Sequence, residues 1–93
     1  ITTKTADYTA LTTDHTILVD ATSNNVTITL PTAVGNSRLY TIKRIDGSVN
    51  TVTIATTSSQ TIDGSTTYTG LLTQYQTVAV QSNSSHYFIT SKF

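Results

Sequence analysis

The sequence predicts an all-β domain built as a two-sheet sandwich. Threonine makes up about a quarter of the chain, and its branched Cβ suits a pleated strand better than a helix. Apolar residues recur at every second position in several segments, which is the side-chain period of a strand with one buried face. Turn-forming residues separate these segments at the spacing typical of sandwiches and barrels. We therefore expect residues 1–93 to form one antiparallel sandwich of jelly-roll type with about eight short strands.

Four strands are expected in the first half of the chain. A weak one lies near Tyr8, and residues 16–20 contain the continuous apolar run Ile-Leu-Val, which predicts burial on both faces. In residues 26–30 three apolar side chains alternate with two threonines, and Pro31 ends this strand because it cannot donate to a ladder. Residues 39–45 alternate again, with Tyr and Ile on the face expected to be buried.

Four more strands are expected in the second half. Residues 52–54 and 78–80 repeat the alternation, and a weaker strand lies near Tyr68. Residues 86–90 carry aromatic side chains on both faces. The apolar faces of residues 26–30, 52–54 and 78–80 are expected to form the internal core.

Turn chemistry accounts for the connections between these strands. The dipeptides Asp46-Gly47 and Asp63-Gly64 each follow an isoleucine, which is a strong hairpin signal. Asn24-Asn25 separates two strands with residues that tolerate the left-handed backbone of tight hairpins. Residues 83–85, Asn-Ser-Ser, form the last turn. Because two-residue hairpins join antiparallel strands, these signals favour antiparallel sheets.

The composition excludes several classes of function. Charged residues are only 11% of the chain and the formal net charge is +0, so no basic surface is available for nucleic acid phosphates or for membrane insertion as an amphipathic helix. No apolar run approaches the length of about 20 residues needed to span a bilayer. The absence of cysteine removes disulfides and thiol chemistry. The chain starts without Met or a signal peptide, so we expect it to be a piece of a longer protein.

Segments along nearly the whole chain, from Tyr8 to Ile89, carry a family resemblance. They are Tyr-Thr-Ala-Leu-Thr-Thr-Asp-His-Thr-Ile-Leu-Val-Asp-Ala-Thr (residues 8–22), Val-Thr-Ile-Thr-Leu-Pro (26–31), Tyr-Thr-Ile-Lys-Arg-Ile-Asp (40–46), Asn-Thr-Val-Thr-Ile (50–54), Thr-Ile-Asp-Gly (61–64) and Tyr-Gln-Thr-Val-Ala-Val-Gln (75–81). In this pattern the chain resembles a small module of bacteriophage tail fibres and related viral fibre proteins. The last strand of such modules often carries a tryptophan, where this chain has His86 or Tyr87.

The resemblance implies a β-sandwich that assembles as a homotrimer at or near the tip of a viral fibre. There it would contact a host-surface glycan or simply end the fibre, next to neighbouring fibre domains. The module would then lie on the virion, outside the host cell. We expect a structural and adhesive function on this basis. The alternative is a monomeric carbohydrate-binding module of a secreted enzyme.

No catalytic residue, metal site or cofactor is expected. His15 and His86 lie far apart in the sequence, and no serine or threonine stands in a recognisable nucleophile motif. Asp46, Ser48 and Asn50 alternate like the opening of a calcium loop, but a threonine occupies the place of the bidentate glutamate. A plain Asp-Gly turn explains the same residues. We therefore expect that the chain is not an enzyme.

Tyrosine is the residue type best suited to contact a sugar, because it combines an apolar ring with a hydroxyl group. The candidate glycan contacts are Tyr68, Tyr75 and His86. Tyr40 and Tyr87 lie in strong strand patterns and are expected to lie in the core or at a subunit interface.

Two further surface features follow from the sequence. Leu71 and Leu72 are adjacent, so only one of them can point into the core, and the other is a candidate contact with a subunit or ligand. The Thr-X-Thr spacing at residues 27–29 and 51–53 puts two hydroxyl groups on one sheet face, an arrangement suited to ice binding. No fixed repeat extends this array, so a soluble sheet surface is the favoured interpretation.

Overall fold

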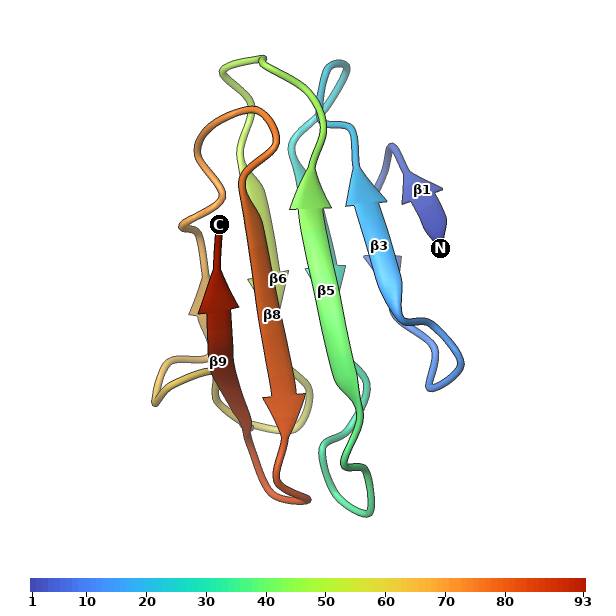
Figure 1. Cartoon of the computed structure of the whole chain (residues 1–93), viewed down its shortest axis with the longest axis vertical. Coiled ribbons are helices and arrows are strands. Elements are labelled where there is room, and N and C mark those ends of the chain that lie inside the picture. Colours follow the sequence, from blue (N-terminus) through green and yellow to red (C-terminus); the bar gives the residue numbers. More distant parts are fainter.

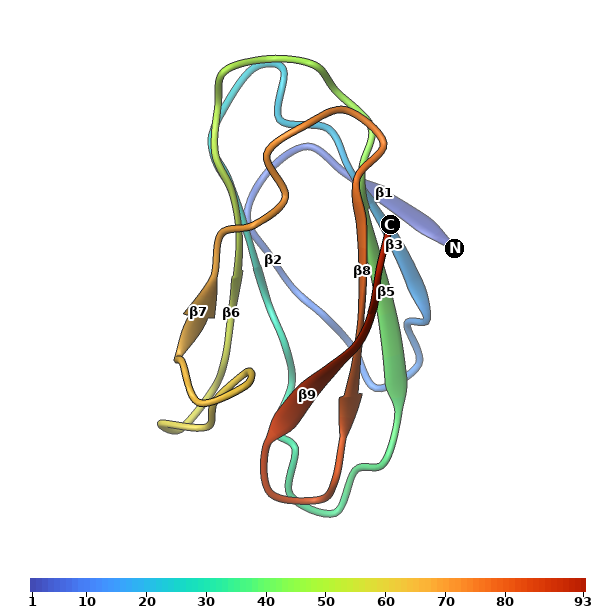
Figure 2. The same cartoon turned by 60° about the vertical axis from the view of Figure 1, so that its left-hand side comes forward.

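A computed structural model describes all residues of the chain, 1–93, as nine short strands without a helix. The strands form two sheets that face each other across one core, which confirms the all-β prediction (Figures 1 and 2). The strands are β1 (Thr2–Lys4), β2 (Tyr8–Thr9), β3 (Thr16–Val19), β4 (Val26–Thr29), β5 (Leu39–Arg44), β6 (Val52–Ala55), β7 (Thr67–Tyr68), β8 (Thr77–Ser82) and β9 (Tyr87–Lys92). The structure has no helix that could span a membrane.

The order of the strands corrects the expected topology. The five-stranded sheet has the order β1-β3-β5-β8-β9 and the four-stranded sheet the order β2-β4-β6-β7. The first six strands alternate between the two sheets, so those of the six that are neighbours within a sheet run in the same direction. Four of the seven strand pairs are parallel, and both sheets are therefore mixed rather than antiparallel. This pairing also departs from a jelly roll, which is built from antiparallel strands.

The reason for the parallel pairs lies in the connections. Asn24-Asn25 and Asp46-Gly47, both expected to form hairpins, lie in segments that cross from one sheet to the other. The other two turn predictions are confirmed. Asp63-Gly64 forms the turn between Ile62 and Ser65, which pair as a short antiparallel bridge. Residues 83–86 connect β8 to β9 as a hairpin.

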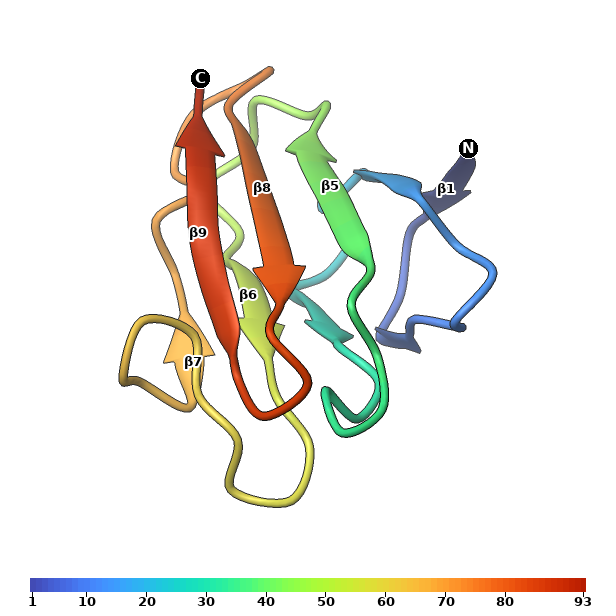
Figure 3. The ribbon, with the colours of Figure 1, turned by 60° about the horizontal axis from the view of Figure 1, so that its bottom comes forward.

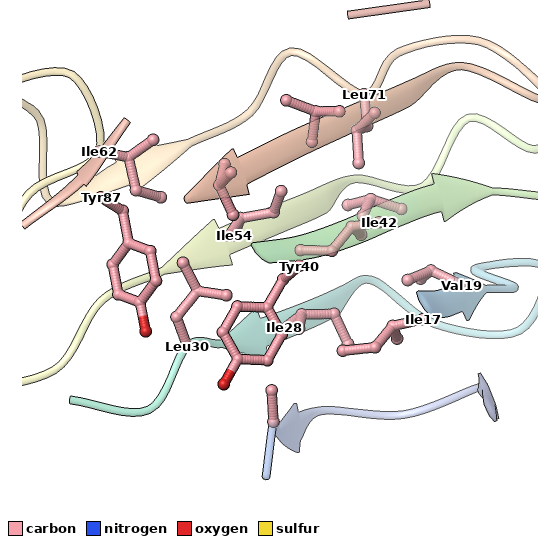
Figure 4. Close-up of a cluster of buried hydrophobic side chains, with 14 of the residues drawn as sticks. Ile17, Val19, Ile28, Leu30, Tyr40, Ile42, Ile54, Ile62, Leu71 and Tyr87 are labelled. Atoms are coloured by element: carbon pink, nitrogen blue, oxygen red, sulfur yellow. The ribbon is translucent and has the colours of Figure 1, made fainter. Parts of the chain in front are cut away.

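One cluster of buried side chains fills the space between the sheets. It includes the apolar faces of residues 26–30, 52–54 and 78–80, as predicted. The rings of Tyr40 and Tyr87 lie in the core as well, with centroids 6.2 Å apart, near Leu30 (Figure 4). The core is made of Ala10, Ile17, Val19, Ala21, Val26, Ile28, Leu30, Ala33, Tyr40, Ile42, Val52, Ile54, Ile62, Leu71, Val78, Val80 and Tyr87.

Two strands near the N-terminus differ from the prediction. β1 was not expected, because the sequence Thr-Thr-Lys has too few apolar residues to show a pattern, yet it pairs in parallel with β3. β3 is buried on one face only, since Ile17 and Val19 are buried and Leu18 is half-buried. The continuous apolar run therefore does not lie between two buried faces.

The loops gather at the two ends of the sandwich (Figures 1 and 3). Residues 20–25, 45–51 and 69–76 lie at one end, which we call the Arg44 pole. The segments that connect strands at the opposite end form the Tyr87 pole, and they are residues 10–15, 30–38, 56–66 and 83–86. The buried hydrogen bonds made by side chains lie at these two poles.

Candidate functional site

The Arg44 pole is organised around one buried guanidinium group. Arg44 lies at the end of β5 on the same face as the core residue Ile42, and its side chain forms an ion pair with Asp46, with Nη2 and Oδ2 3.1 Å apart. Both side chains are 2% exposed. They are two residues apart, which places them on the same side of an extended chain. The pair was not predicted, although the sequence contains a signal for it: a basic residue at a buried strand position two residues before an aspartate.

The guanidinium group also binds the backbone of two loops. Arg44 Nη1 donates to the carbonyl oxygen of Leu71 at 3.0 Å, and Nη2 donates to the carbonyl oxygens of Ser48 at 3.0 Å and of Asn50. Moving either loop would break these bonds and leave a buried charge without partners, which is costly. The bonds therefore fix the two loops in place. We call Arg44, Asp46, Ser48, Asn50 and Leu71 the Arg44 network.

Asp46 completes the network on the acidic side. Its carboxylate accepts hydrogen bonds from the Ala21 N–H at 2.9 Å and from the Ser48 hydroxyl at 2.7 Å. Burial by itself would raise the pKa of Asp46, but the hydrogen bonds from Arg44, Ser48 and the Ala21 N–H outweigh it and hold the pKa well below its usual range. The carboxylate therefore stays ionised.

The network revises the two interpretations of residues 46–50. Asp46, Ser48 and Asn50 do bring their oxygens together, as a calcium loop would, but these oxygens face the guanidinium group of Arg44, which is the cation at this position. The interpretation as a plain Asp-Gly turn is wrong as well. Asp46 is only 6% exposed, and its carboxylate accepts a hydrogen bond from the N–H of Ala21, 25 residues away in the sequence. No three His or Asp side chains gather as metal ligands anywhere in the structure.

Three exposed apolar side chains stand on the outside of this pole. Val49, Leu72 and Tyr75 are 101%, 70% and 60% exposed. Leu71 is 1% exposed, so the prediction that only one of the two adjacent leucines is buried is confirmed. Tyr75 has a φ of 67°, and its N–H donates to the carbonyl oxygen of Arg44 at 2.7 Å. The Lys43 ammonium lies 5.6 Å from the centre of the Tyr75 ring.

The three candidate glycan residues do not lie together. Tyr75 precedes β8 at the Arg44 pole, whereas His86 follows β8 at the Tyr87 pole, where its Nδ1 accepts a hydrogen bond from the Thr61 N–H at 3.1 Å. Tyr68 lies on β7 and is half-buried, with the Lys92 ammonium of β9 5.7 Å from the centre of its ring. The three residues therefore do not form one surface, because His86 and Tyr75 lie at opposite poles.

The Tyr87 pole is held around Tyr87 itself by uncharged groups, although Asp14 and Asp63 also accept hydrogen bonds in its loops. The Tyr87 hydroxyl donates to the Pro31 carbonyl oxygen at 2.7 Å, and Gln60 accepts from the Ala33 N–H at 2.7 Å. The Ser82 hydroxyl also donates to the Ala33 carbonyl oxygen, at 3.0 Å. Burial, together with the neighbouring Tyr40, raises the pKa of Tyr87 to about 12. This pole thus has a neutral counterpart to the Arg44 network.

The outer face of the five-stranded sheet carries a second group of exposed apolar side chains. Leu39, Gln81 and Phe88 lie opposite one another on β5, β8 and β9, and Leu39 and Phe88 are 36% and 44% exposed. Beside them on β8, Thr77 and Ala79 are small and nearly buried, although they point away from the core. This face is therefore level at its centre, and two exposed apolar side chains, Leu39 and Phe88, lie on either side of Gln81. We call these two side chains the apolar row.

The outer face of the four-stranded sheet is covered by threonines. The register places Thr27 opposite Thr53, and Thr29 opposite Thr9. The two Thr-X-Thr segments thus lie side by side in parallel strands, offset by two residues. Asp7 and Ala55 interrupt the array, since Asp7 accepts from the Thr27 N–H at 2.8 Å and Ala55 lies opposite Thr29. Nearby, the loop residues Ala6, Asp7, Asn24 and Asn25 line a shallow hollow.

Comparison of the chain with protein-family models, curated proteins and solved structures gives no match. The resemblance to viral fibre modules therefore stays a prediction.

Proposed function

We propose that this chain is a structural and adhesive module of a viral tail fibre, which holds three copies of itself together and contacts a host-surface glycan. The proposal places the module on the virion, beside neighbouring fibre domains, and gives it no catalytic residue and no cofactor. It rests on the segments that resemble fibre modules and on one structural observation, the apolar row on the outer face of the five-stranded sheet.

That row suits contact with another copy of the chain. Leu39 and Phe88 stand on a sheet face whose centre, at Thr77 and Ala79, has no side chain large enough to hold a partner away. Lys43 is the charged residue on the outer faces of β5 and β8, so a partner would remove few charges from water. Exposed apolar side chains grouped on such a face are typical of protein interfaces.

The solution mass of the chain tests assembly. We expect size exclusion with light scattering to give three times the chain mass of 10.0 kDa. Phe88→Lys should convert the trimer into a folded monomer, because it puts a charge in the apolar row. The control is Val49→Lys, a more exposed apolar position at the Arg44 pole, which should leave the trimer intact.

A folded wild-type monomer would contradict the trimer. It would favour the second candidate, a monomeric carbohydrate-binding module of a secreted enzyme, which is supported by the exposed Tyr75 on a fixed loop of a single chain. A trimer that survives Phe88→Lys would show that assembly uses another face.

A further inference from the structure

We propose that the Arg44 pole binds an uncharged oligosaccharide, with the Tyr75 ring as the surface on which a sugar stacks and Val49 and Leu72 as flanking contacts. This inference names the ligand site of the adhesive part of the proposed function and rests on it. Four observations support it: the fixed backbone of the pole, the conformation of Tyr75, the balance of charge, and the position relative to the apolar row.

The first observation is that the three exposed side chains stand on a fixed backbone. Val49 lies between Ser48 and Asn50, and the carbonyl oxygens of both neighbours accept hydrogen bonds from Arg44. Leu72 follows Leu71, whose carbonyl oxygen is bound by the same guanidinium group, and the Leu72 N–H donates to Gln76 Oε1 at 2.8 Å. A site on a preformed backbone loses little conformational freedom when a ligand binds.

The second observation is the backbone of Tyr75 itself. Its φ of 67° lies in the left-handed region, which is unusual for a residue with a large side chain and persists only where surrounding contacts hold it. The contact here is the hydrogen bond from the Tyr75 N–H to the Arg44 carbonyl oxygen. Gly or Asn would fit this conformation with less strain. The chain instead presents an aromatic ring to solvent at this position, as a contact surface for a ligand requires.

The third observation is that the pole is electrically neutral. Arg44 and Asp46 compensate each other inside the network. Asp20 is the one other charged residue in residues 20–25, 45–51 and 69–76, and Lys43 of β5 has the opposite charge. The two residues before Tyr75 in the same loop, Thr73 and Gln74, carry a hydroxyl and an amide group. An aromatic ring among uncharged donors and acceptors fits a sugar, whose C–H face packs on the ring while its hydroxyls form hydrogen bonds.

The fourth observation is the location of Tyr75 relative to the proposed subunit contact. Leu39 and Phe88 lie at the start of β5 and of β9, near the Tyr87 pole, whereas Tyr75 lies beyond the other end of β5 (Figure 1). Subunit packing centred on Leu39 and Phe88 would therefore leave a ligand at Tyr75 accessible, whereas packing that extended over Thr77 would reach Tyr75.

Titration of the isotope-labelled protein with uncharged oligosaccharides, observed by NMR, tests the site. The probes are maltohexaose, cellohexaose, xylohexaose and laminarihexaose at millimolar concentration. We expect at least one of them to shift the signals of Val49, Leu72 and Tyr75. Tyr75→Asn, which keeps the left-handed backbone but removes the ring, should weaken binding about tenfold or more, and Tyr75→Phe should keep most of it. The control is Ser84→Asn, also at a positive φ of 74° but at the Tyr87 pole.

Absence of shifts at these three residues with all four probes would overturn the site, as would unchanged affinity of Tyr75→Asn. Attachment to host cells that survives enzymatic removal of their surface glycans would overturn it in favour of a protein ligand. The outcome is separate from that of the assembly test. A trimer without sugar binding would leave the fibre proposal and remove this site, whereas a monomer that binds sugar through Tyr75 would leave the site and remove the fibre.

Discussion

The four residues Ile-Asp-Gly-Ser occur once at each pole of the sandwich and adopt different structures there. At the Tyr87 pole, residues 62–65 form a two-residue turn in which Ile62 and Ser65 exchange both backbone hydrogen bonds, at 2.6 and 3.0 Å. Asp63 and Gly64 have φ values of 49° and 87°, as a type I′ turn requires. At the Arg44 pole, residues 45–48 take no positive φ, and the aspartate is buried in an ion pair.

The difference comes from the residue before each copy. Arg44 precedes the first copy and brings a buried charge that needs a counterion within reach, and Asp46 is the carboxylate two residues away. Thr61 precedes the second copy and is uncharged, so it needs no counterion. Asp63 and Gly64 therefore follow their intrinsic turn preference. At residues 45–48 the buried charge therefore overrides the conformation that these four residues prefer locally.

The same substitution in both copies should therefore have unequal effects. Asp46→Asn leaves the guanidinium group of Arg44 buried without a counterion, and we expect it to lower the free energy of unfolding by about 3–5 kcal/mol. Asp63→Asn should cost no more than about 0.5 kcal/mol, because asparagine tolerates a positive φ and retains an oxygen to accept the Ile89 N–H. Urea unfolding of both variants, followed by circular dichroism, measures the difference. Equal losses would show that the Arg44 network does not hold its pole.

Stability should depend on pH differently at the two poles. Because the pKa of Asp46 is lowered by folding, its contribution is complete above the unfolded-state value of about 3.9 and is lost as the pH falls below it. The pKa of Tyr87 is raised to about 12, so its contribution is complete below the ordinary value of about 10 and is lost as the pH rises from there towards 12. Acid should thus weaken the Arg44 pole and alkali the Tyr87 pole.

Unfolding curves across pH, with two variants, test this assignment. Asp46→Asn should flatten the decline of stability on the acid side and leave the alkaline side unchanged. Tyr87→Phe should do the reverse, with a loss of about 1–3 kcal/mol at neutral pH because the Pro31 carbonyl oxygen loses its donor. If the free energy of unfolding falls as steeply at low pH in Asp46→Asn as in the wild type, the fall belongs to other aspartates. Asp14, whose pKa is also lowered, is one of them.

The two copies also show what the sequence can predict. The strands other than β1 were predicted because their alternation is local, and so were the core faces of residues 26–30, 52–54 and 78–80. The turn at Asp63-Gly64 was also predicted, because local preference prevails there. The parallel pairing was not, because it depends on connections such as residues 20–25 crossing between the sheets. The Arg44 network has a local signal in the spacing of Arg44 and Asp46, but its partners Ala21 and Leu71 are distant in sequence.

The separation of the candidate glycan residues has a similar origin. Tyr75 and His86 flank β8, and a strand of six residues is about 20 Å long, so residues at its two ends cannot share a small ligand. The strand was predicted from the alternation of its residues. The three side chains were chosen as candidate glycan contacts without regard to where they lie on the predicted strands. The predicted strand, residues 78–80, lies between Tyr75 and His86 and already indicated that these two residues are at opposite ends of it.

The smallest effect is expected for the glycines of the two copies. Gly64 has a φ of 87°, so Gly64→Ala should lower the free energy of unfolding by about 1 kcal/mol through backbone strain, even though an added Cβ would meet no atom within 4 Å. Gly47→Ala should cause no loss, because its backbone is not left-handed and the added Cβ would meet only the flexible end of Gln74, at 3.4 Å. The urea midpoints of the two variants, compared with that of the wild type, measure the two losses. A loss at Gly47 as large as that at Gly64 would mean that both copies prefer the same turn and that Arg44 does not set the difference.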